Sequence, residues 1–253
     1  MKLEYWNKLA ATFETDVFQP VANDMNGTIL TALSKLASKN RSVADIGCGT
    51  GSLLPTLARQ FQSVLAIDLS EGCLKIAEKR NKHLRNVKLL QLDLCRKIPE
   101  LEQVDVGVCL NVAIMPDYSR RRRLFENVSG LIAANGRLLL LIPSLESVLL
   151  TVHRLVQWNL EECSSYRQAA AEASYELGFT AASIRDGIVK KGGTNTKHYL
   201  KEELEILTRE LGFQLCSISK VEYSWATEFS HPPDSMGAPY PWDWFVVMKP
   251  GAN

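Results

Sequence analysis

Three glycines within five residues follow a short apolar run in the segment VADIGCGTGS, residues 43–52. Glycine adopts positive φ readily and lets the backbone come close to a ligand, so this segment predicts a tight ligand-binding loop. A dinucleotide-binding loop has the pattern G-x-G-x-x-G, and here the third glycine, Gly51, comes one residue too early. A phosphate-binding P-loop needs Gly-Lys-Ser/Thr, whereas Ser52 and Leu53 follow Gly51. Neither phosphate-binding pattern fits the loop.

Short apolar runs alternate with helical patterns around this loop. The runs predicted as buried strands are 42–46, 64–67, 87–90, 104–110 and 137–142. One helical stripe consists of Leu53, Leu54, Leu57, Ala58 and Phe61. A second consists of Leu124, Val128, Leu131 and Ile132, and the pair Asn135-Gly136 is its predicted end. The alternation predicts parallel strands joined by crossover helices, which is an open α/β sheet covered on both faces.

The pattern changes after Pro143. An amphipathic helix is predicted over 145–156 and an alanine-rich helix over 166–177, and the glycine-broken stretch IRDGIVKKGGTN can form a loop or a small hairpin. Leucines at 200, 204, 207 and 211 predict another helix, with Gly212 as its cap, before a sixth strand at 213–221 and a seventh at 244–248. We therefore expect one domain over 1–253, with an insertion at 144–197.

Composition excludes several classes of protein. The formal net charge is +1 at pH 7, so no global field attracts nucleic acid, and the run Arg120 to Arg123 is interpreted as the solvated start of a helix. Six cysteines lie scattered without a C-x-x-C pair, which favours free thiols in a reducing cytoplasm and predicts no metal site. The start MKLEYWNKLA lacks the apolar core of a signal peptide, and no aliphatic run is long enough to span a bilayer. We expect a cytoplasmic protein without a membrane partner.

Three acids indicate the ligand. Asp68 ends the second predicted strand, where a carboxylate can accept hydrogen bonds from both ribose hydroxyls. Asp93 follows the third strand, where it can accept from an adenine amino group or simply cap the strand end. Asp45 lies beside the glycines, where an acid suits a cationic amino group. Ribose, adenine and a positively charged tail without a phosphate describe S-adenosylmethionine.

The chain resembles the class I, Rossmann-like S-adenosylmethionine-dependent methyltransferases over residues 41–249. VADIGCGTG, VLAIDLS, LLQLDL and VDVGVCLNVAIMP match the family's first, ribose-binding, adenine-side and fourth-strand motifs in order. The resemblance implies a three-layer α/β/α fold with a seven-stranded sheet of order 3-2-1-4-5-7-6, whose seventh strand is antiparallel. The residues expected to bind the cofactor are Asp45, Gly47, Cys48, Gly49, Gly51, Asp68, Leu69, Asp93, Leu94 and Asn111. Cys48 is expected to be a small spacer and not a nucleophile.

Three segments are expected to cover the methyl acceptor. They are an N-terminal lid helix at 1–20, which resembles a segment that closes over the cofactor in similar methyltransferases, a helical cap at 144–197 and an aromatic, proline-rich substrate loop at 223–242. The segments at 144–197 and 223–242 meet the carboxyl edge of the predicted sheet. The N-terminal segment and the loop at 223–242 can instead pack on the core for stability alone. The candidate acceptor-binding residues are Tyr5, Trp6, Trp225, Glu228 and His231.

The expected reaction is methyl transfer by in-line displacement to O or N of a small-molecule acceptor, to which the protein contributes mainly positioning. His198 and Tyr199, at the start of the late helix, are the candidate catalytic residues, and the further acid–base candidates are His153, Glu228, His231 and Asp234. Asn111 is followed by Val-Ala-Ile-Met-Pro and therefore lacks the Asn-Pro-Pro-Tyr signature of base and glutamine methylation. The alternatives are a nucleic-acid or protein methyltransferase, thiol or arsenic methylation through cysteines, and a cofactor-binding protein without catalysis. We expect a monomer or a homodimer.

Overall fold

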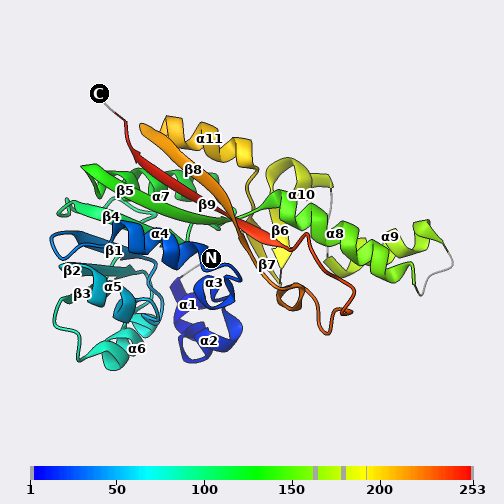
Figure 1. The fold of residues 1–253 in the computed structure, drawn as a ribbon, viewed down its shortest axis with the longest axis horizontal. Coiled ribbons are helices and arrows are strands. Elements are labelled where there is room, and N and C mark those ends of the chain that lie inside the picture. The colour runs from blue at the N-terminus through cyan, green and yellow to red at the C-terminus, as the bar shows by residue number, and fades with distance from the viewer. Residues whose placement is uncertain (1–2, 162–164, 178–180, 192, 252–253) are drawn as a thin grey trace.

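The computed structural model describes residues 3–161, 165–177, 181–191 and 193–251. Among them, seven strands form one sheet of order β3-β2-β1-β4-β5-β9-β8, in which β9 runs antiparallel to both of its neighbours (Figure 1). The strands are β1 Ser42–Ile46, β2 Ser63–Asp68, β3 Val87–Gln91, β4 Val104–Leu110, β5 Ile132–Pro143, β8 Phe213–Glu222 and β9 Trp242–Pro250. The expected strand order is confirmed, with β8 and β9 as the predicted sixth and seventh strands.

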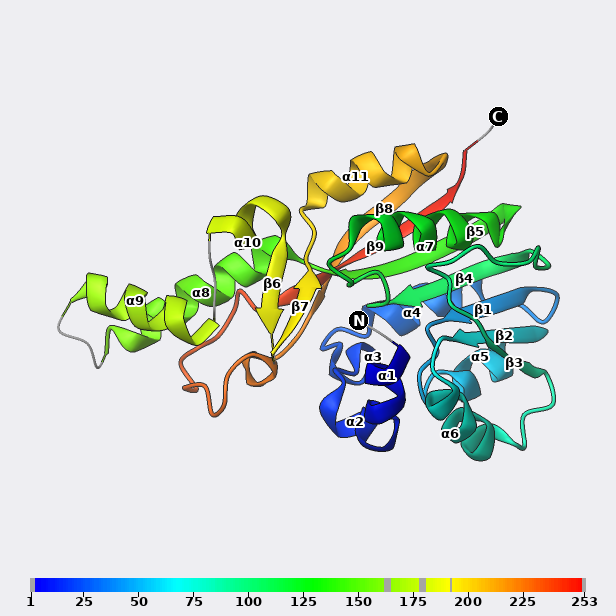
Figure 2. The same cartoon turned by 180° about the vertical axis from the view of Figure 1, so that it is seen from behind.

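Helices cover both faces of the sheet (Figure 2). One face carries α4 Thr28–Leu36, α5 Leu54–Gln60 and α6 Glu71–Asn81, and the other carries α7 Tyr118–Gly130 and α11 Lys201–Glu210. Each strand contributes side chains to the cores on both faces of the sheet, because successive side chains point to opposite faces. In β5, Leu138 and Leu140 join the cluster under α7 and α11, while Leu139 and Leu141 join the cluster under α4 and α5. Burial on both faces explains why the strand sequences are continuous apolar runs.

The boundary between α7 and β5 differs from the prediction. The helix ends at Gly130, well before Asn135-Gly136, and Ile132 already pairs with Val104 of β4. The next pair is Arg137 with Val106, so the residues between bulge out of the ladder. Leu131 and Ile132 fit the helical stripe in the sequence and are buried as it predicts. They lie beyond the end of α7, however, and Ile132 is the first residue of β5.

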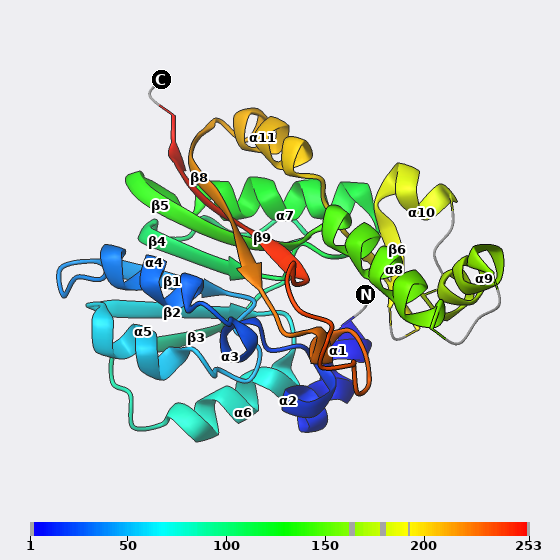
Figure 3. The ribbon, with the colours of Figure 1, turned by 45° about the vertical axis from the view of Figure 1, so that its right-hand side comes forward.

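The segment between β5 and α11 projects away from the sheet (Figure 3). Its helices are α8 Leu145–Asn159, α9 Tyr166–Leu177 and α10 Ala181–Asp186. Leu155 and Val156 of α8 pack against Ala169 and Ala173 of α9 in a small separate core. The glycine-broken stretch forms a hairpin, in which β6 Ile188–Lys191 pairs with β7 Thr194–Lys197.

Short helices form the N-terminal segment where one helix over 1–20 was expected. They are α1 Leu3–Leu9, a 3-10 helix at Ala10–Thr12, α2 Phe13–Asp16 and α3 Pro20–Asn23, and residues 1–2 lie outside the described ranges. Both views place this segment beside α6, beneath the carboxyl ends of the strands (Figures 1 and 2). Within the described ranges, none of the helices is long and apolar enough to cross a bilayer.

Replacing Leu139 with alanine should test the packing of the central strands. Leu139 is fully buried, so the substitution should lower the free energy of unfolding by about 2–5 kcal/mol, measured by urea denaturation. Ile206→Ala is the control, because Ile206 is half exposed and its loss should change stability by about 0.5 kcal/mol or less. Equal effects of the two substitutions would contradict this assignment of the core.

Candidate active site

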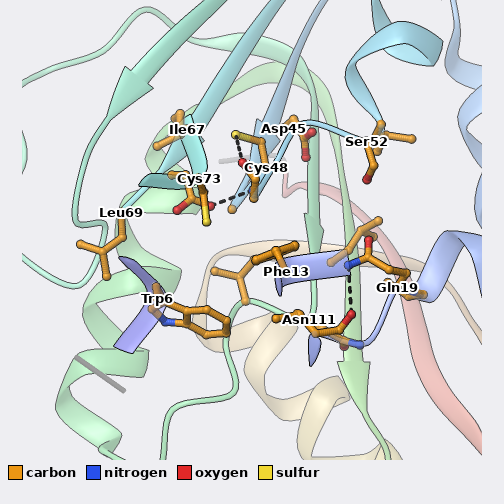
Figure 4. A pocket seen from close by; sticks show the side chains of 18 of the residues that line it. Trp6, Phe13, Gln19, Asp45, Cys48, Ser52, Ile67, Leu69, Cys73 and Asn111 are labelled. Atoms are coloured by element: carbon orange, nitrogen blue, oxygen red, sulfur yellow. Dashed lines mark hydrogen bonds between the residues drawn. The ribbon is translucent and has the colours of Figure 1, made fainter. Parts of the chain in front are cut away.

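A cavity of about 570 Å³ lies at the carboxyl ends of β1, β2, β3 and β4. Its lining comes from the glycine loop, from the residues after these strands, and from the N-terminal segment on the opposite side (Figure 4). The sheet order reverses between β1 and β4, and open α/β sheets bind ligands at such a point. All ten predicted cofactor residues except Gly51 line this cavity.

The glycine loop is held in a shape that requires glycine. Gly47, Gly49 and Gly51 have φ values of 75°, 53° and 78°. A Cβ atom on Gly47 would lie 2.4 Å from Val112, and one on Gly49 would lie 2.6 Å from the ring of Phe13. A Cβ on Gly51 would meet Asn81, Ala77 and Leu54 at 2.8–2.9 Å, so this glycine serves helix packing. Because these glycines carry no Cβ atom, Val112, Phe13 and Asn81 can pack directly against the backbone of the loop.

Asp68 closes the loop from the end of β2. Its Oδ2 accepts a hydrogen bond from the Gly49 N–H at 2.9 Å, and its Oδ1 accepts one from the Ser70 N–H at 2.8 Å. Burial raises the pKa of the Asp68 carboxyl, and these backbone donors oppose that rise. A carboxylate offers about four acceptor sites, so Asp68 can still accept a hydrogen bond from a ligand beside its backbone donors.

Asp45 is the most unusual group in the cavity. Only 5% of the residue is exposed, and its Oδ2 has no hydrogen-bond partner among the described residues. Burial, with a further contribution from the Asp68 carboxylate, raises the pKa of Asp45 to about 7. A buried carboxylate without a partner is costly. A cationic group bound in the cavity would compensate this cost.

Asp93 is held by its own loop. Its Oδ1 accepts from the Cys95 N–H at 3.0 Å, and its Oδ2 lies 3.1 Å from Arg96 and 3.8 Å from Arg120. Leu94, next to it, is buried in the lining. The carboxylate remains partly exposed at the cavity, after β3, where the sequence places it.

The basic run at the start of α7 is not the fully solvated stretch that the sequence suggests. Arg120 lines the cavity, and Arg121 is buried, with Nη1 donating to the Met115 carbonyl at 2.7 Å. Arg122 and Arg123 both form ion pairs with Glu126. Helical spacing turns successive arginines to different sides, so only part of the run can face solvent.

Asn111 follows β4 with a positive φ of 54°, a conformation that asparagine adopts more readily than most residues. Its Nδ2 donates to Asp243 Oδ2 at 2.8 Å, and the Tyr223 hydroxyl donates to the same oxygen at 3.0 Å. The Asn111 Oδ1 is buried and has no hydrogen-bond partner within the described ranges. Burial raises the pKa of the Tyr223 hydroxyl, and the nearby Asp243 adds to this rise. Tyr223 is therefore a donor to Asp243.

The N-terminal segment is fastened over the glycine loop. Asn7 Oδ1 accepts from Ser70 Oγ at 2.6 Å and from the Gly72 N–H at 3.3 Å. Glu14 forms an ion pair with Arg80 of α6. Together with the contact between Phe13 and Gly49, these bonds make the segment one wall of the cavity.

The five candidate acceptor residues are dispersed. Trp6 lines the cavity, whereas the hydroxyl of Tyr5 lies 3.5 Å from Thr194 of the hairpin. Trp225, in the 3-10 helix Trp225–Thr227, is buried with its Nε1 bonded to the Gly237 carbonyl. Glu228 and His231 are not part of the lining either, and His231 is exposed. The Trp225 side chain thus stabilises the loop at 223–242 and does not line the cavity.

The two candidate catalytic residues lie outside the cavity lining as well. The Tyr199 hydroxyl donates to the Ala113 carbonyl at 2.7 Å, and burial raises its pKa. His198 is buried, with Nε2 at 3.1 Å from Thr196 Oγ1, and its backbone N–H donates to the Gly187 carbonyl at 2.7 Å. These contacts join the hairpin and the start of α11 to the end of the sheet.

Three residues at or beside the cavity were not predicted from the sequence. Asp243 and Tyr223 form the hydrogen bonds around Asn111, and Gln19 lines the cavity. Asp243 lies between Trp242 and Trp244 at the start of a buried strand. A charged residue at such a position is a signal of function that could have been noticed. Gln19, on the cavity wall, carried no comparable signal.

Comparisons with known proteins agree with this geometry. Residues 43–136 match the family model described as "Methyltransferase domain". A Saccharomyces cerevisiae protein described as "Probable S-adenosylmethionine-dependent methyltransferase CRG1" is 29% identical over 142 residues, which cover 53% of this chain and 46% of that protein. The chain thus spans about half the length of this curated relative.

Two solved structures share the fold over almost their full lengths. The N-methyltransferase NodS from Bradyrhizobium japonicum WM9, in complex with S-adenosyl-L-homocysteine, matches with a TM-score of 0.63 and 14% identity, covering 99% of this chain and 98% of that one. The DhpI complex with the same ligand, abbreviated SAH, matches with a TM-score of 0.58 and 17% identity, covering 99% and 96%. At these identities the likeness concerns the fold.

Replacing Asp45 with asparagine should stabilise the ligand-free protein at neutral and higher pH. The folded-state pKa of about 7 exceeds the unfolded value, so wild-type stability falls as the pH rises from about 4 to 7. The variant should lack this fall, and its melting temperature should exceed that of the wild type at about pH 8 but not at about pH 4. Asp234→Asn, at an exposed position, is the control. A variant less stable than wild type at the higher pH would show that the carboxylate is well solvated.

Replacing Tyr199 with phenylalanine should weaken folding, because the Ala113 carbonyl would be left buried without its donor. The expected loss of unfolding free energy is about 1–3 kcal/mol, measured by urea denaturation. Tyr175→Phe, at a fully exposed ring, should leave stability unchanged. No difference between the two variants would mean that the Tyr199 hydroxyl does not hold the sheet edge.

Proposed function

We propose that the chain is a class I, Rossmann-like S-adenosylmethionine-dependent methyltransferase, that its cavity binds S-adenosylmethionine and that it methylates a small molecule at O or N. The observation that carries the proposal is the Asp45 carboxylate. It is buried, lacks a partner on Oδ2, and lies beside a glycine loop that offers no cation to a phosphate. A ligand with a cationic amino group and no phosphate meets both conditions.

The donor set of the cavity fits this cofactor. Asp45 would hold the amino group, and the backbone of Gly47 and Gly49 would allow close approach. Asp68, whose carboxylate has more acceptor sites than backbone donors, would accept from the ribose hydroxyls. Asp93 would lie at the adenine end, beside Leu94. Burial raises the pKa of the Cys48 thiol, which keeps it protonated and suits a spacer.

The bound cofactor supplies an activated methyl group on a positively charged sulfur. The chain contributes position and a dry environment. Trp6 and Phe13 line the cavity from the fastened N-terminal segment, where they would exclude water that could compete for the methyl group. Asp45 and Asp68 would orient the two ends of the cofactor from the rigid ends of β1 and β2.

A small acceptor is favoured by the limited volume of the cavity. About 570 Å³ must accommodate the cofactor and the reacting part of the acceptor. A nucleic-acid acceptor is less favoured, because the basic run does not present a row of cations. Arg121 is buried and bonded to Met115, while Arg122 and Arg123 both pair with Glu126.

A reducing, cytoplasmic location forms part of the proposal. Cys48, Cys73, Cys95, Cys109 and Cys216 are free thiols. Cys163 lies outside the described residues. Three of these thiols, those of Cys48, Cys73 and Cys95, line the cavity, where oxidation would obstruct the proposed cofactor site.

Calorimetric titration with S-adenosylmethionine, S-adenosylhomocysteine and NAD tests the proposal. We expect the first two to bind and NAD not to bind, because the loop has no place for a pyrophosphate. Binding without methyl transfer to any acceptor would leave a cofactor-binding protein. Failure of both sulfur ligands to bind would overturn the proposal.

Replacing Asp68 with asparagine should weaken binding of S-adenosylhomocysteine by about tenfold or more. The variant loses charge-assisted hydrogen bonds to the ribose, each worth about 1.5–3 kcal/mol. Its side-chain oxygen can still accept from one backbone N–H of the loop, so folding should be largely kept. Asp234→Asn is the matched control, with unchanged affinity expected. An unchanged affinity of the Asp68 variant would disprove the ribose assignment.

A further inference from the structure

We propose that Arg120 and Asp93 together recognise the edge of the adenine base: Asp93 accepts a hydrogen bond from the 6-amino group, and Arg120 donates one to a ring nitrogen beside it. This inference rests on the proposed function, in which Asp93 lies at the adenine end of the cavity, and it adds Arg120 as a residue that selects the base. The sequence suggests that this arginine belongs to a solvated run, whereas it lines the cavity.

The start of α7 directs Arg120 to the cavity. Asp117 caps the helix, and its Oδ1 accepts a hydrogen bond from the Arg120 backbone N–H at 2.8 Å. Arg120 and Leu124 are four residues apart, so they lie on the same face of the helix, and both line the cavity. The next arginine, Arg121, bonds instead to the Met115 carbonyl. Helical spacing therefore gives Arg120 different surroundings from the rest of the basic run.

Arg120 lies beside Asp93, which comes from the loop after β3. Its Nη2 is 3.8 Å from Asp93 Oδ2. This distance is too long for a hydrogen bond, so the ion pair uses neither an N–H of the guanidinium nor a lone pair of the carboxylate. Both residues line the cavity, and the side chains of Arg120 and Asp93 are 34% and 18% exposed. A ligand in the cavity can therefore reach both groups.

The two groups match the hydrogen-bonding pattern of adenine. A guanidinium only donates, and an ionised carboxylate only accepts. In adenine the 6-amino donor stands between two acceptors, the ring nitrogens N1 and N7, so either edge of the base offers one donor beside one acceptor. A 6-oxo purine presents an acceptor at the position of the amino group and would set it against the carboxylate.

The side chains around this pair are apolar. Leu92 and Leu94 flank Asp93 in the sequence, Leu124 shares the helix face of Arg120, and all three line the cavity. A base between these side chains loses its contact with water, so each polar group on its edge needs a partner in the protein. A base whose edge does not match Arg120 and Asp93 would leave buried groups unpaired, and this is the origin of the selection.

The charges of the lining also favour the base at this end. Among the described residues that line the cavity, Arg120 is the only cation, and it lies beside Asp93. Asp45, in β1, and Asp68, at the end of β2, have no cation beside them in this part of the lining. A neutral base thus suits the Arg120 end, and the cationic tail of the cofactor suits the Asp45 end.

Two analogues of S-adenosylhomocysteine test the contact between Arg120 and a ring nitrogen. The 1-deaza compound lacks N1, the 7-deaza compound lacks N7, and both keep the amino group. In calorimetric titrations, we expect one of the two to bind the wild-type protein about tenfold or more weakly than S-adenosylhomocysteine, as for one lost charge-assisted hydrogen bond. Equal affinities for all three compounds would overturn the proposal from the wild-type protein alone.

Arg120→Met should remove this difference in affinity. Methionine keeps a long side chain in the apolar lining but donates no hydrogen bond. We expect the variant to bind S-adenosylhomocysteine about tenfold more weakly than the wild type does, and to bind the weaker of the two analogues with unchanged affinity. A loss by the same factor for all three compounds would mean that the guanidinium packs on the face of the base or acts through its charge alone, and the proposal would then be wrong.

Arg96→Met is the matched control. Arg96 Nε lies 3.1 Å from the same oxygen of Asp93, but its side chain is 82% exposed and does not line the cavity. The substitution removes a charge beside Asp93 and leaves the lining intact, so we expect all three affinities to stay as in the wild type. Losses equal to those of Arg120→Met would assign the effect to the charge near Asp93 and overturn the proposal.

The wild-type affinity for S-adenosylhomocysteine separates the possible failures. If the wild type binds this ligand and Arg120→Met binds it equally well, the inference fails while the proposed function stands. If the wild type does not bind it, the proposed function fails, and the inference fails with it.

Discussion

The carbonyl oxygen of Ile67 accepts hydrogen bonds from the N–H groups of both Gly47 and Cys48, at 2.7 and 3.0 Å. This pair of bonds ties the glycine loop of β1 to the end of β2. The loop can lie there only because its glycines adopt positive φ. Once it is held, the Gly49 N–H meets Asp68, and Phe13 fits where a Cβ would otherwise stand. The cavity, its acids and its N-terminal wall all depend on this attachment.

Local patterns predicted the parts of the fold whose causes are local. The strands are apolar runs because both faces of the sheet are buried, so β1 and β4 have the predicted bounds. The end of α7 was misjudged, because Leu131 and Ile132 continue a helical stripe while pairing with β4 makes Ile132 a strand residue. Whether Ile132 belongs to a helix or to a strand depends on its pairing with β4, so the helical stripe alone cannot predict it.

The candidate site divides in the same way. Asp45 lies in β1, Asp68 ends β2 and Asp93 follows β3, each within a recognisable motif, so their arrival at one cavity could be predicted from the sheet alone. His198 was chosen for its chemistry and its place before a helix, yet its surroundings depend on how the hairpin folds back. Asp243 comes from the far end of the chain and reaches Asn111 only through the antiparallel strand β9.

The N-terminal segment supplies one wall of the cavity from outside the motif-bearing core, and few bonds hold it. The residues of this wall therefore can change in evolution without disturbing the loop, the strands or the acids on the opposite side. Trp6, Phe13 and Phe18 line the cavity from this segment, whereas Asp45 and Asp68 belong to the sheet. Such a division would let one frame built from the sheet accommodate different ligands through variation of a short stretch of chain.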